Sequence, residues 1–323
     1  MTPVDTPVDV VLIGRNEGDR LKAALASVAG QARQIVYVDS GSTDGSVAAA
    51  QDAGAKVVNL DMTRPFSAAR ARNAGFDALD APEYVQFIDG DCALVPGYLD
   101  AARSFLDENP GTGMVTGWRS EIHRDASVYN QLCDWEWRRP AGEIAACGGD
   151  MMVRAGLWRD VGGMKPEVIA SEDEEICVRF RKAGWTLYRI PHEMTRHDAA
   201  MTRFGQWWSR AVRTGHGFAQ VGYLHPEYFF VERRRVLIYG LALPLLFLAG
   251  LLTTLWLSAA VLAVYALNYV RTAQGLIRDG LPAAQAWRHS LFLTLSKIPN
   301  LIGMARFHTR RVRRSDMRII EYK

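Results

Sequence analysis

Two aspartates separated by one glycine follow an apolar stretch at residues 84–88 and have the chemistry of a divalent metal site. The β-branched and aromatic residues of that stretch predict a buried strand, with Asp89 and Asp91 at its carboxyl end. On extended backbone, residues two apart project to the same side, and Gly90 leaves the space between them open. Two convergent carboxylates suit a hard divalent cation that also binds phosphate oxygens. A polar turn with a capping aspartate is the alternative interpretation.

The elements that must position these carboxylates are strands and helices in alternation. Strands are predicted at residues 8–13, 34–38, 56–60 and 84–88, and residues with helical spacing lie between them. This alternation implies right-handed βαβ crossovers and a mostly parallel sheet, an α/β fold. Such sheets bind ligands outside the carboxyl ends of their strands.

Polar residues stand at these strand ends. Arg15 and Glu17 follow the first strand, and Asp39 ends the second. We therefore expect them to share one rim of the sheet with the aspartate pair. The sequence after the first strand lacks the GxGxxG fingerprint of dinucleotide-binding folds. Asp39 could accept hydrogen bonds from ribose hydroxyls or a base, although a capping role explains such a residue equally well.

Composition excludes several classes of protein. The 323-residue chain has 38 basic and 35 acidic residues, and a net charge of +3 is too small to suggest a nucleic-acid partner. Its four cysteines have neither zinc nor CxxC spacing and are expected to be reduced and buried. The first nine residues have no basic or apolar region of the kind found in secretory signals.

The C-terminal part of the chain changes character. Residues 236–270 contain no charged side chain. A single helix of that length would run about 52 Å, against a hydrocarbon core of about 30 Å. We therefore expect a break within residues 250–258, giving a membrane hairpin with a kink at Pro244, although a buried helical core is the alternative. Arginines at both ends of the run suggest that both ends face the cytoplasm. Residues 287–307 resemble an interfacial helix, and the six arginines at residues 306–318 favour anionic lipid headgroups.

Six motifs, in this order and spacing, resemble family 2 glycosyltransferases with the GT-A fold. The motifs are VVLIGRNEGDRLKAALASV, IVYVDSGSTDGSVAAA, FSAARARNAGF, FIDGDC, CGGDMMVRAGLWRDVGGM and SEDEEICVRFRKAGW. The resemblance covers about residues 8–215. It implies a GT-A, Rossmann-like catalytic domain at residues 1–230, followed at residues 231–323 by a membrane hairpin and basic interfacial helices.

The resemblance also implies a donor site for a nucleoside-diphosphate sugar. Asp91 would bind Mg2+ or Mn2+, and Asp89 would lie near the ribose or complete the coordination shell. The other residues expected near the donor are Arg15, Glu17, Asp39, Arg72, Asn73, Gly148 and Gly149. His197 would lie close to the diphosphate or the metal, although a lone histidine is as often structural.

A catalytic base completes the implied chemistry. An acceptor hydroxyl is a poor nucleophile near neutral pH, so an inverting transfer needs a carboxylate to take its proton. The resemblance selects Asp173 as this base and Glu172 as its support. Acidic residues in a first helical turn are also favoured by the helix dipole, which is the alternative reason for both.

The implied enzyme is non-processive, because the QxxRW motif of polymerising synthases is not matched. Membrane attachment favours a lipid-linked or glycan acceptor and places the catalytic domain on the cytoplasmic side of the inner membrane. Two alternative functions are a phosphatase and a non-catalytic scaffold. A haloacid-dehalogenase phosphatase would carry its DxD on the first strand, whereas three strands precede it here. A non-catalytic, membrane-bound scaffold with the same fold would have no need of Asp89, Asp91 and Asp173.

Overall fold

The computed structural model describes residues 8–321, which divide into two compact units. The sheet unit contains residues 8–125, 133–200 and 317–319, and the helical unit contains residues 126–132, 201–316 and 320–321. The domain boundary predicted at residue 230 stays a prediction. The two units are groups of residues in mutual contact, and such groups do not test where a catalytic domain ends.

Nine strands in the described residues form one sheet in the order β3-β2-β1-β4-β8-β6-β9-β5, with β7 paired to β9. Their bounds are β1 Val8–Gly14, β2 Ile35–Asp39, β3 Lys56–Asn59, β4 Tyr84–Asp89, β5 Cys92–Leu94, β6 Thr112–Glu121, β7 Gly142–Glu143, β8 Met151–Arg154 and β9 Thr186–His197. The first four strands along the sheet are parallel, as predicted. Beyond β4 the pairing is mixed, because β8 runs antiparallel to both of its neighbours.

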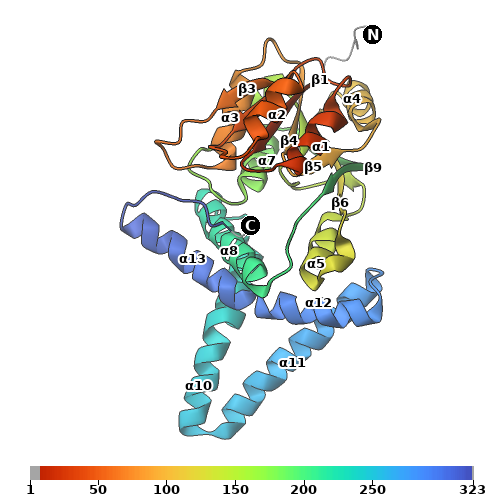
Figure 1. Ribbon diagram of the computed structural model, residues 1–323. Helices are drawn as coiled ribbons and strands as arrows, with labels where there is room; N and C mark the ends of the chain where they lie inside the picture. The colour runs from red at the N-terminus through yellow and green to blue at the C-terminus, as the bar shows by residue number, and fades with distance from the viewer. Residues whose placement is uncertain (1–7, 322–323) are drawn as a thin grey trace. The chain divides into compact units, whose positions relative to one another are not determined.

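Helices cover both faces of this sheet (Figure 1). Along β1, Val10 and Leu12 enter one apolar core with α1 and α4, whereas Val11 and Ile13 enter the other with α3, α6 and α7. This explains why β1 is a continuous apolar run, as expected for a strand buried on both faces. The helices of this part of the chain are α1 Asp19–Val28, α2 Ser46–Asp52, α3 Ala68–Asp77, α4 Tyr98–Glu108, α5 Val128–Trp137, α6 Ala155–Asp160 and α7 Glu172–Lys182, with a 3-10 turn at Arg124–Ala126.

The chain turns immediately after β4. Gly90 and Asp91 form a turn between β4 and β5, so Asp89 and Asp91 do not share one extended strand. The expectation that both project to the same side of extended backbone was wrong. An added Cβ on Gly90 would lie 3.0 Å from the carbonyl oxygen of Ile13, so a glycine lets this turn lie against β1.

The helical unit contains α8 Phe204–Leu224, α9 Phe230–Leu237, a π-helical turn at Ile238–Ala242, α10 Leu243–Thr253, α11 Leu255–Arg278, α12 Ala283–Leu295 and α13 Lys297–Val312. The expected break in the uncharged run is confirmed at Thr254. The segments Phe230–Thr253 and Leu255–Arg278 are each long and apolar enough to cross a membrane. The stretch at residues 287–307 is divided between two helices that meet at Ser296, instead of forming one interfacial helix.

Pro244 is accommodated by the π-helical turn before it. The N–H of Leu243 bonds to the carbonyl of Ile238 in the π register, and the next residue, Pro244, has no N–H to offer to Tyr239. The Tyr265 hydroxyl of α11 donates to the Tyr239 carbonyl. One tyrosine therefore satisfies a backbone oxygen that the proline leaves without a helical donor.

Candidate functional site

The carboxyl ends of three parallel strands bring the predicted donor residues to one rim of the sheet. Gly14 of β1 pairs with Asp39 of β2, and Ile13 pairs with Asp89 of β4. Asp39 is buried and accepts hydrogen bonds from the backbone N–H groups of Gly41 and Ser42, which fixes the loop after β2. The shared rim is therefore as expected.

Arg15 and Glu17 lie in the loop after β1, at the same rim. Arg15 is exposed, and Glu17 forms an ion pair of 2.8 Å with Arg20. The Cγ atom of Glu17 would lie 3.1 Å from a Cβ added at Gly14, so this acidic side chain packs over the end of β1. Contacts of either residue with a donor stay predictions.

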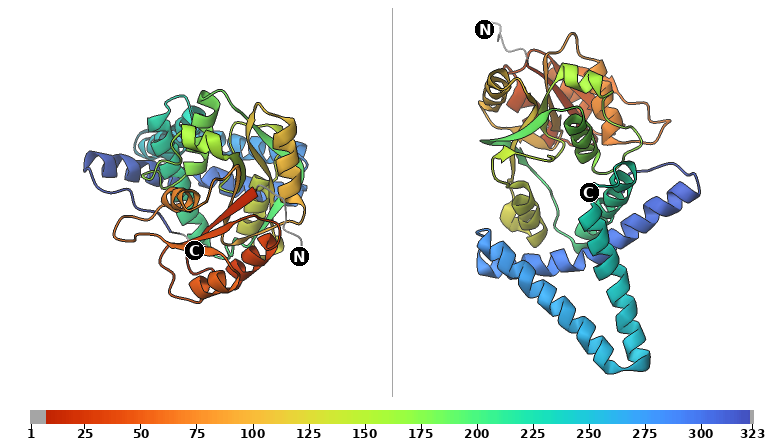
Figure 2. Two further views of the ribbon diagram at one scale, coloured as in Figure 1. Left: turned by 90° about the horizontal axis from the view of Figure 1, so that it is seen from above. Right: turned by 180° about the vertical axis from the view of Figure 1, so that it is seen from behind.

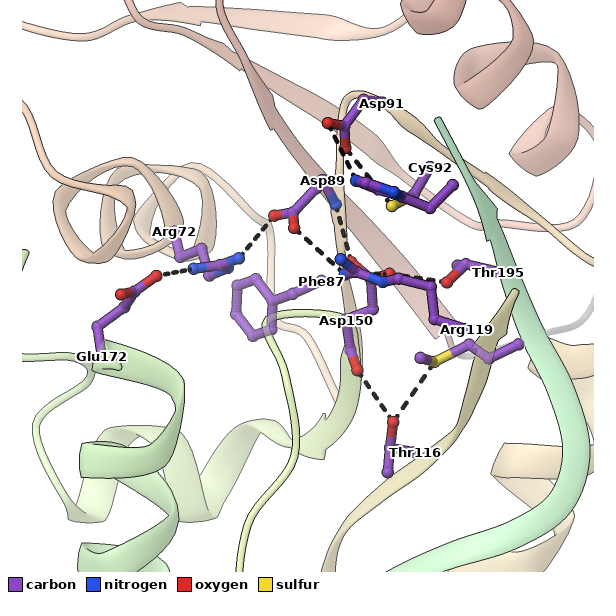
Figure 3. Close-up of polar contacts among 12 residues, drawn as sticks. Arg72, Phe87, Asp89, Asp91, Cys92, Thr116, Arg119, Asp150, Glu172 and Thr195 are labelled. Atoms are coloured by element: carbon purple, nitrogen blue, oxygen red, sulfur yellow. Dashed lines mark hydrogen bonds and ion pairs between the residues drawn. The ribbon is translucent and has the colours of Figure 1, made fainter. Parts of the chain in front are cut away.

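Two arginines hold the two oxygens of Asp89 (Figure 3). Arg72 Nη2 donates to Oδ1 at 2.7 Å, and Arg119 Nη2 donates to Oδ2 at 3.3 Å. Burial would raise the pKa of Asp89, but the two guanidinium groups outweigh it and lower that pKa. Asp89 is therefore an ionised carboxylate whose position is set from both sides.

Arg119 connects Asp89 to a second buried carboxylate, Asp150. The Arg119 Nη2 to Asp150 Oδ2 distance is 2.6 Å, and the Asp150 side chain is 1% exposed. Asp150 also accepts hydrogen bonds from the backbone N–H of Asp89 at 3.0 Å and from the Thr195 hydroxyl at 2.8 Å. Figure 3 shows these groups converging beneath the end of β4. Through these contacts, Asp150 holds both the backbone of Asp89 and Arg119, which is a counter-ion of Asp89.

Asp91 faces His197 instead of the arginine pair. His197 Nε2 lies 3.3 Å from Asp91 Oδ2, and both side chains are nine-tenths buried or more. Glu121 lies 3.2 Å from the other ring nitrogen, Nδ1, and also accepts the N–H of Ala199. A carboxylate on the far nitrogen is the arrangement that orients metal-binding histidines, because it directs the free Nε2 at the metal.

These residues fit a divalent cation. Asp91 offers carboxylate oxygen from the turn before β5, and His197 offers Nε2 from the end of β9, where it pairs with Cys92 of β5. Burial would raise the pKa of Glu121, but its hydrogen bond to His197 and two backbone N–H groups lower that pKa, so it stays an acceptor for the ring. Two protein ligands leave coordination positions for phosphate oxygens, as is common for Mg2+ and Mn2+ sites.

Glu172 and Asp173 are the first two residues of α7, and Arg72 connects this helix to Asp89. Arg72 Nη1 donates to Glu172 at 2.9 Å, so one fully buried guanidinium joins Asp89 to this helix. Asp173 lies beside Gly148, because a Cβ added there would stand 3.9 Å from its Oδ2. Burial, together with the charges of Glu172 and Glu174, raises the pKa of Asp173 to about 8, with Arg72 acting in the opposite direction. Such a carboxyl group can hold or release a proton near neutral pH.

Two predicted donor residues have structural contacts. A Cβ at Gly149 would lie 1.9 Å from Arg72 Nη2, so this glycine makes room for the guanidinium. Asn73 donates to the carbonyl of Met164 at 2.7 Å and accepts its N–H at 2.9 Å. Direct contact of Gly149 and Asn73 with a donor stays a prediction.

Sequence reasoning missed Arg119 and Glu121 as parts of this site. The resemblance placed a sugar beside Asp150 but did not indicate that Asp150 holds Asp89 and Arg119. Asp150 follows the paired glycines of CGGD, which was the one signal available for it. Arg119 lies in β6 where its pairing with β9 shifts register twice, at Thr116/Trp118 and Trp118/Arg119. Bulges of this kind re-aim side chains, so strand alternation could not indicate which way Arg119 points.

The comparisons with known proteins concern the family and the fold of the chain. Residues 9–147 match the family model described as Glycosyl transferase family 2. A curated relative, a TPR repeat-containing protein of Synechococcus elongatus, is 26% identical over 190 residues, which are 59% of this chain and 41% of that protein. The chain thus spans well under half the length of this relative.

Solved structures share the fold at low sequence identity. The mannosyltransferase PcManGT from Pyrobaculum calidifontis, in complex with GDP-Man and Mn2+, is 18% identical with a TM-score of 0.59, covering 94% of this chain and 87% of that one. TarS residues 1–349 from S. aureus is 15% identical with a TM-score of 0.51, covering 67% of this chain and 64% of that one. Glucosyl-3-phosphoglycerate synthase from Mycobacterium tuberculosis, with Mn2+ and UDP-glucose, is 15% identical with a TM-score of 0.50, covering 66% and 78%.

Proposed function

The chain belongs to glycosyl transferase family 2 and has the GT-A fold, and from this premise we propose that it is an inverting, metal-dependent enzyme. It moves a sugar from a nucleoside diphosphate to a hydroxyl of an acceptor. The observation that carries the proposal is the connection of two acidic centres. Asp91 pairs with His197, Glu172 precedes Asp173 on α7, and Arg72 joins Glu172 to Asp89, which lies two residues before Asp91.

The donor binds at the rim formed by the ends of β1, β2 and β4. Glu17 and Asp39 hold the base and ribose, and the diphosphate lies toward Asp91 and His197. Asp91 and His197 would hold a divalent cation there, and this cation would supply positive charge beside the negative charge that develops on the leaving nucleoside diphosphate. Two of the structures similar to this chain contain Mn2+ with a nucleotide sugar, which supports Mn2+ as the ion.

Asp173 acts as the base. It accepts the proton of the acceptor hydroxyl while the acceptor oxygen forms a bond to the anomeric carbon and the bond to the diphosphate oxygen breaks. One displacement inverts the configuration at that carbon, and no protein nucleophile is needed. Glu172 is held by Arg72, so its charge stays beside Asp173 and keeps the pKa of that group high enough for proton transfer.

The acceptor is lipid-linked or a glycan at the membrane. The hairpin of α10 and α11, which has no charged side chain between residues 236 and 270, anchors the chain in the inner membrane, and arginines at both ends of this run keep the sheet unit on the cytoplasmic side, where nucleotide sugars are made. Deleting residues 236–270 should move the protein from the membrane pellet to the supernatant. Retention in the pellet would reject the hairpin as the principal anchor.

The enzymatic proposal is tested by thermal-shift measurements on the purified chain with a panel of UDP-, GDP- and dTDP-sugars, with Mn2+ and with a chelator. We expect one nucleotide sugar to stabilise the protein only when Mn2+ is present. Asp91→Ala should remove this stabilisation, whereas Asp100→Ala, which changes an exposed acid in α4, should keep it. If no nucleotide binds under any condition, the chain acts as a membrane-bound scaffold instead.

A further inference from the structure

The small net charge of the chain is the sum of two regions with net charges of opposite sign. Residues 1–200 contain 30 acidic and 21 basic residues, a net charge of −9. Residues 201–323 contain 5 acidic and 17 basic residues, a net charge of +12. The acids of the same region can therefore balance at most five of these 17 basic side chains.

Much of this positive charge is exposed and lies outside the uncharged run. The exposed arginines, which we call the basic collar, belong to α9, α11, α12, α13 and the turn after α13. They are Arg234, Arg235, Arg271, Arg278, Arg288, Arg306, Arg311, Arg313 and Arg314. None of them lies within residues 236–270. The charged side chains therefore stop at Arg235, directly before the uncharged run, and resume at Arg271, directly after it.

Within the helical unit, the collar belongs to helices at the open end of the hairpin. Helices α10 and α11 meet at the Thr254 turn and diverge toward their other ends (Figures 1 and 2). In both side views α12 runs across this open end, and α13 continues from it past α10 and away from the hairpin. The turn itself carries apolar side chains, because Leu252 and Trp256 are 88% and 85% exposed. Basic side chains at the open end of an apolar hairpin match the headgroup layer that borders the hydrocarbon core of a membrane.

The pKa values of two histidines reflect the same positive charge. His216 of α8 is fully buried, and burial followed by the charges of Arg310, Arg213 and Arg306 lowers its pKa to about 3. The pKa of the exposed His308 is lowered by partial desolvation and then by Arg311 and Arg233. The arginines that lower these two pKa values all belong to residues 201–323.

We propose that the basic collar is a binding surface for anionic phospholipid headgroups, which supply the negative charge that residues 201–323 lack. The surface rests on the membrane attachment proposed above and adds to it a preference for one class of lipid. Several arginines at a membrane surface contribute additively to binding of anionic lipids, and the effect falls off with added salt. The apolar side chains that accompany the arginines, Trp287 and Leu291 of α12 and Val312 of α13, are exposed and would enter the acyl boundary.

Lipid selectivity of the full chain tests this directly. The protein is reconstituted in phosphatidylcholine bilayers, and the restricted fractions of spin-labelled phosphatidylglycerol and spin-labelled phosphatidylcholine are compared at low and high salt. We expect about fivefold or greater selection of phosphatidylglycerol at low salt, reduced at high salt. Changing Arg306, Arg311, Arg313 and Arg314 together to Gln should remove most of this selection. The matched control changes four exposed basic residues of the sheet unit, Lys22, Arg64, Arg159 and Lys182, to Gln and should leave it unchanged.

Equal binding of the two lipids by the unaltered chain would overturn the proposal, and so would equal selection in both variants. Tight binding of RNA by the collar without lipid selection would overturn it as well. Donor-induced stabilisation is measured on the same preparations in detergent. A chain that binds its donor but shows no lipid selection rejects the collar alone, whereas loss of donor binding rejects the enzymatic proposal.

Discussion

The two units of this protein use charge in opposite ways. In the sheet unit, charged side chains are drawn inward and paired: Arg72 is 2% exposed and Asp150 is 1% exposed, and each meets ions of opposite sign. In the helical unit, positive charge is in excess and is exposed in the basic collar. Burying a charge is expensive unless it is paired, so the buried network of the sheet unit marks a function in the interior. The exposed excess of the helical unit instead indicates a partner outside the chain.

Variants at Asp91 and at the residues that orient His197 should have the largest effect, and they test the role of the buried charges of the sheet unit. Asp91→Ala removes the carboxylate that faces His197, and we expect transfer to fall roughly a thousandfold or more, since a metal ion contributes several kcal/mol of charge stabilisation. Glu121→Gln keeps both ligands but weakens the orientation of the ring, and it should reduce Mn2+ affinity by about 10- to 100-fold. Mn2+ titrations of transferase activity check both values. Equal effects of the two variants would contradict this division of roles.

Arg119 tests whether the buried pairs are needed for folding. Arg119→Ala leaves Asp150 as a buried charge without its guanidinium, and we expect the free energy of unfolding to fall by about 3–5 kcal/mol. Arg138→Ala is the control, because Arg138 is 55% exposed and its partner Asp134 retains Arg124. That variant should lose about 1 kcal/mol or less. Urea denaturation compares them, and similar losses for both would show that burial does not distinguish the two networks.

The pH dependence of Asp173 is a smaller effect with a defined sign. Its pKa in the folded state, about 8, lies above the ordinary value of 3.8. The folded state therefore loses stability relative to the unfolded state as the pH rises from about 4 to 8. Asp173→Asn should unfold at a higher temperature than the unaltered chain above pH 8 and at the same temperature below pH 4. Thermal unfolding across this range is the measurement, and parallel curves would contradict the raised pKa.

The smallest expected effect comes from a neutral hydrogen bond in the helical unit, between α11 and the π-helical turn. Tyr265→Phe removes the hydroxyl that reaches the Tyr239 carbonyl, and we expect a loss of about 0.6–2 kcal/mol. Tyr239→Phe is the matched control, because it keeps the carbonyl that accepts the bond. Unfolding of the reconstituted chain in mixed micelles compares the two. Equal losses would remove the assigned role of Tyr265.

Local patterns predicted the first half of the sheet and the hairpin well, for physical reasons. Uninterrupted apolar strands such as β1 can be buried only between two layers of helices, and an uncharged run longer than a bilayer must break. The break at Ser296 had no comparable signal. The carboxylate partners of His197 were also beyond local pattern, because Glu121 lies 76 residues away and is aligned by the pairing of β6 with β9.

The arginines illustrate the same limit. The sequence motif drew attention to Arg72, but only the fold shows that it joins Asp89 to Glu172, 100 residues further along the chain. Gly149 was expected to admit a ligand, and its visible consequence is space for that guanidinium. Spacing along a chain identifies residue types that suit a reaction, whereas their pairing depends on strands and helices that meet only in the folded state.

The most direct test of the account compares donor binding with sugar transfer in Asp173→Asn. The account predicts that this variant binds the nucleotide sugar and Mn2+ as tightly as the unaltered chain, because Asp91 and His197 are untouched, while transfer to the acceptor falls by about 10²–10⁴-fold. A variant that transfers sugar at the normal rate would show that Asp173 is not the base and would contradict the assignment of the acidic site.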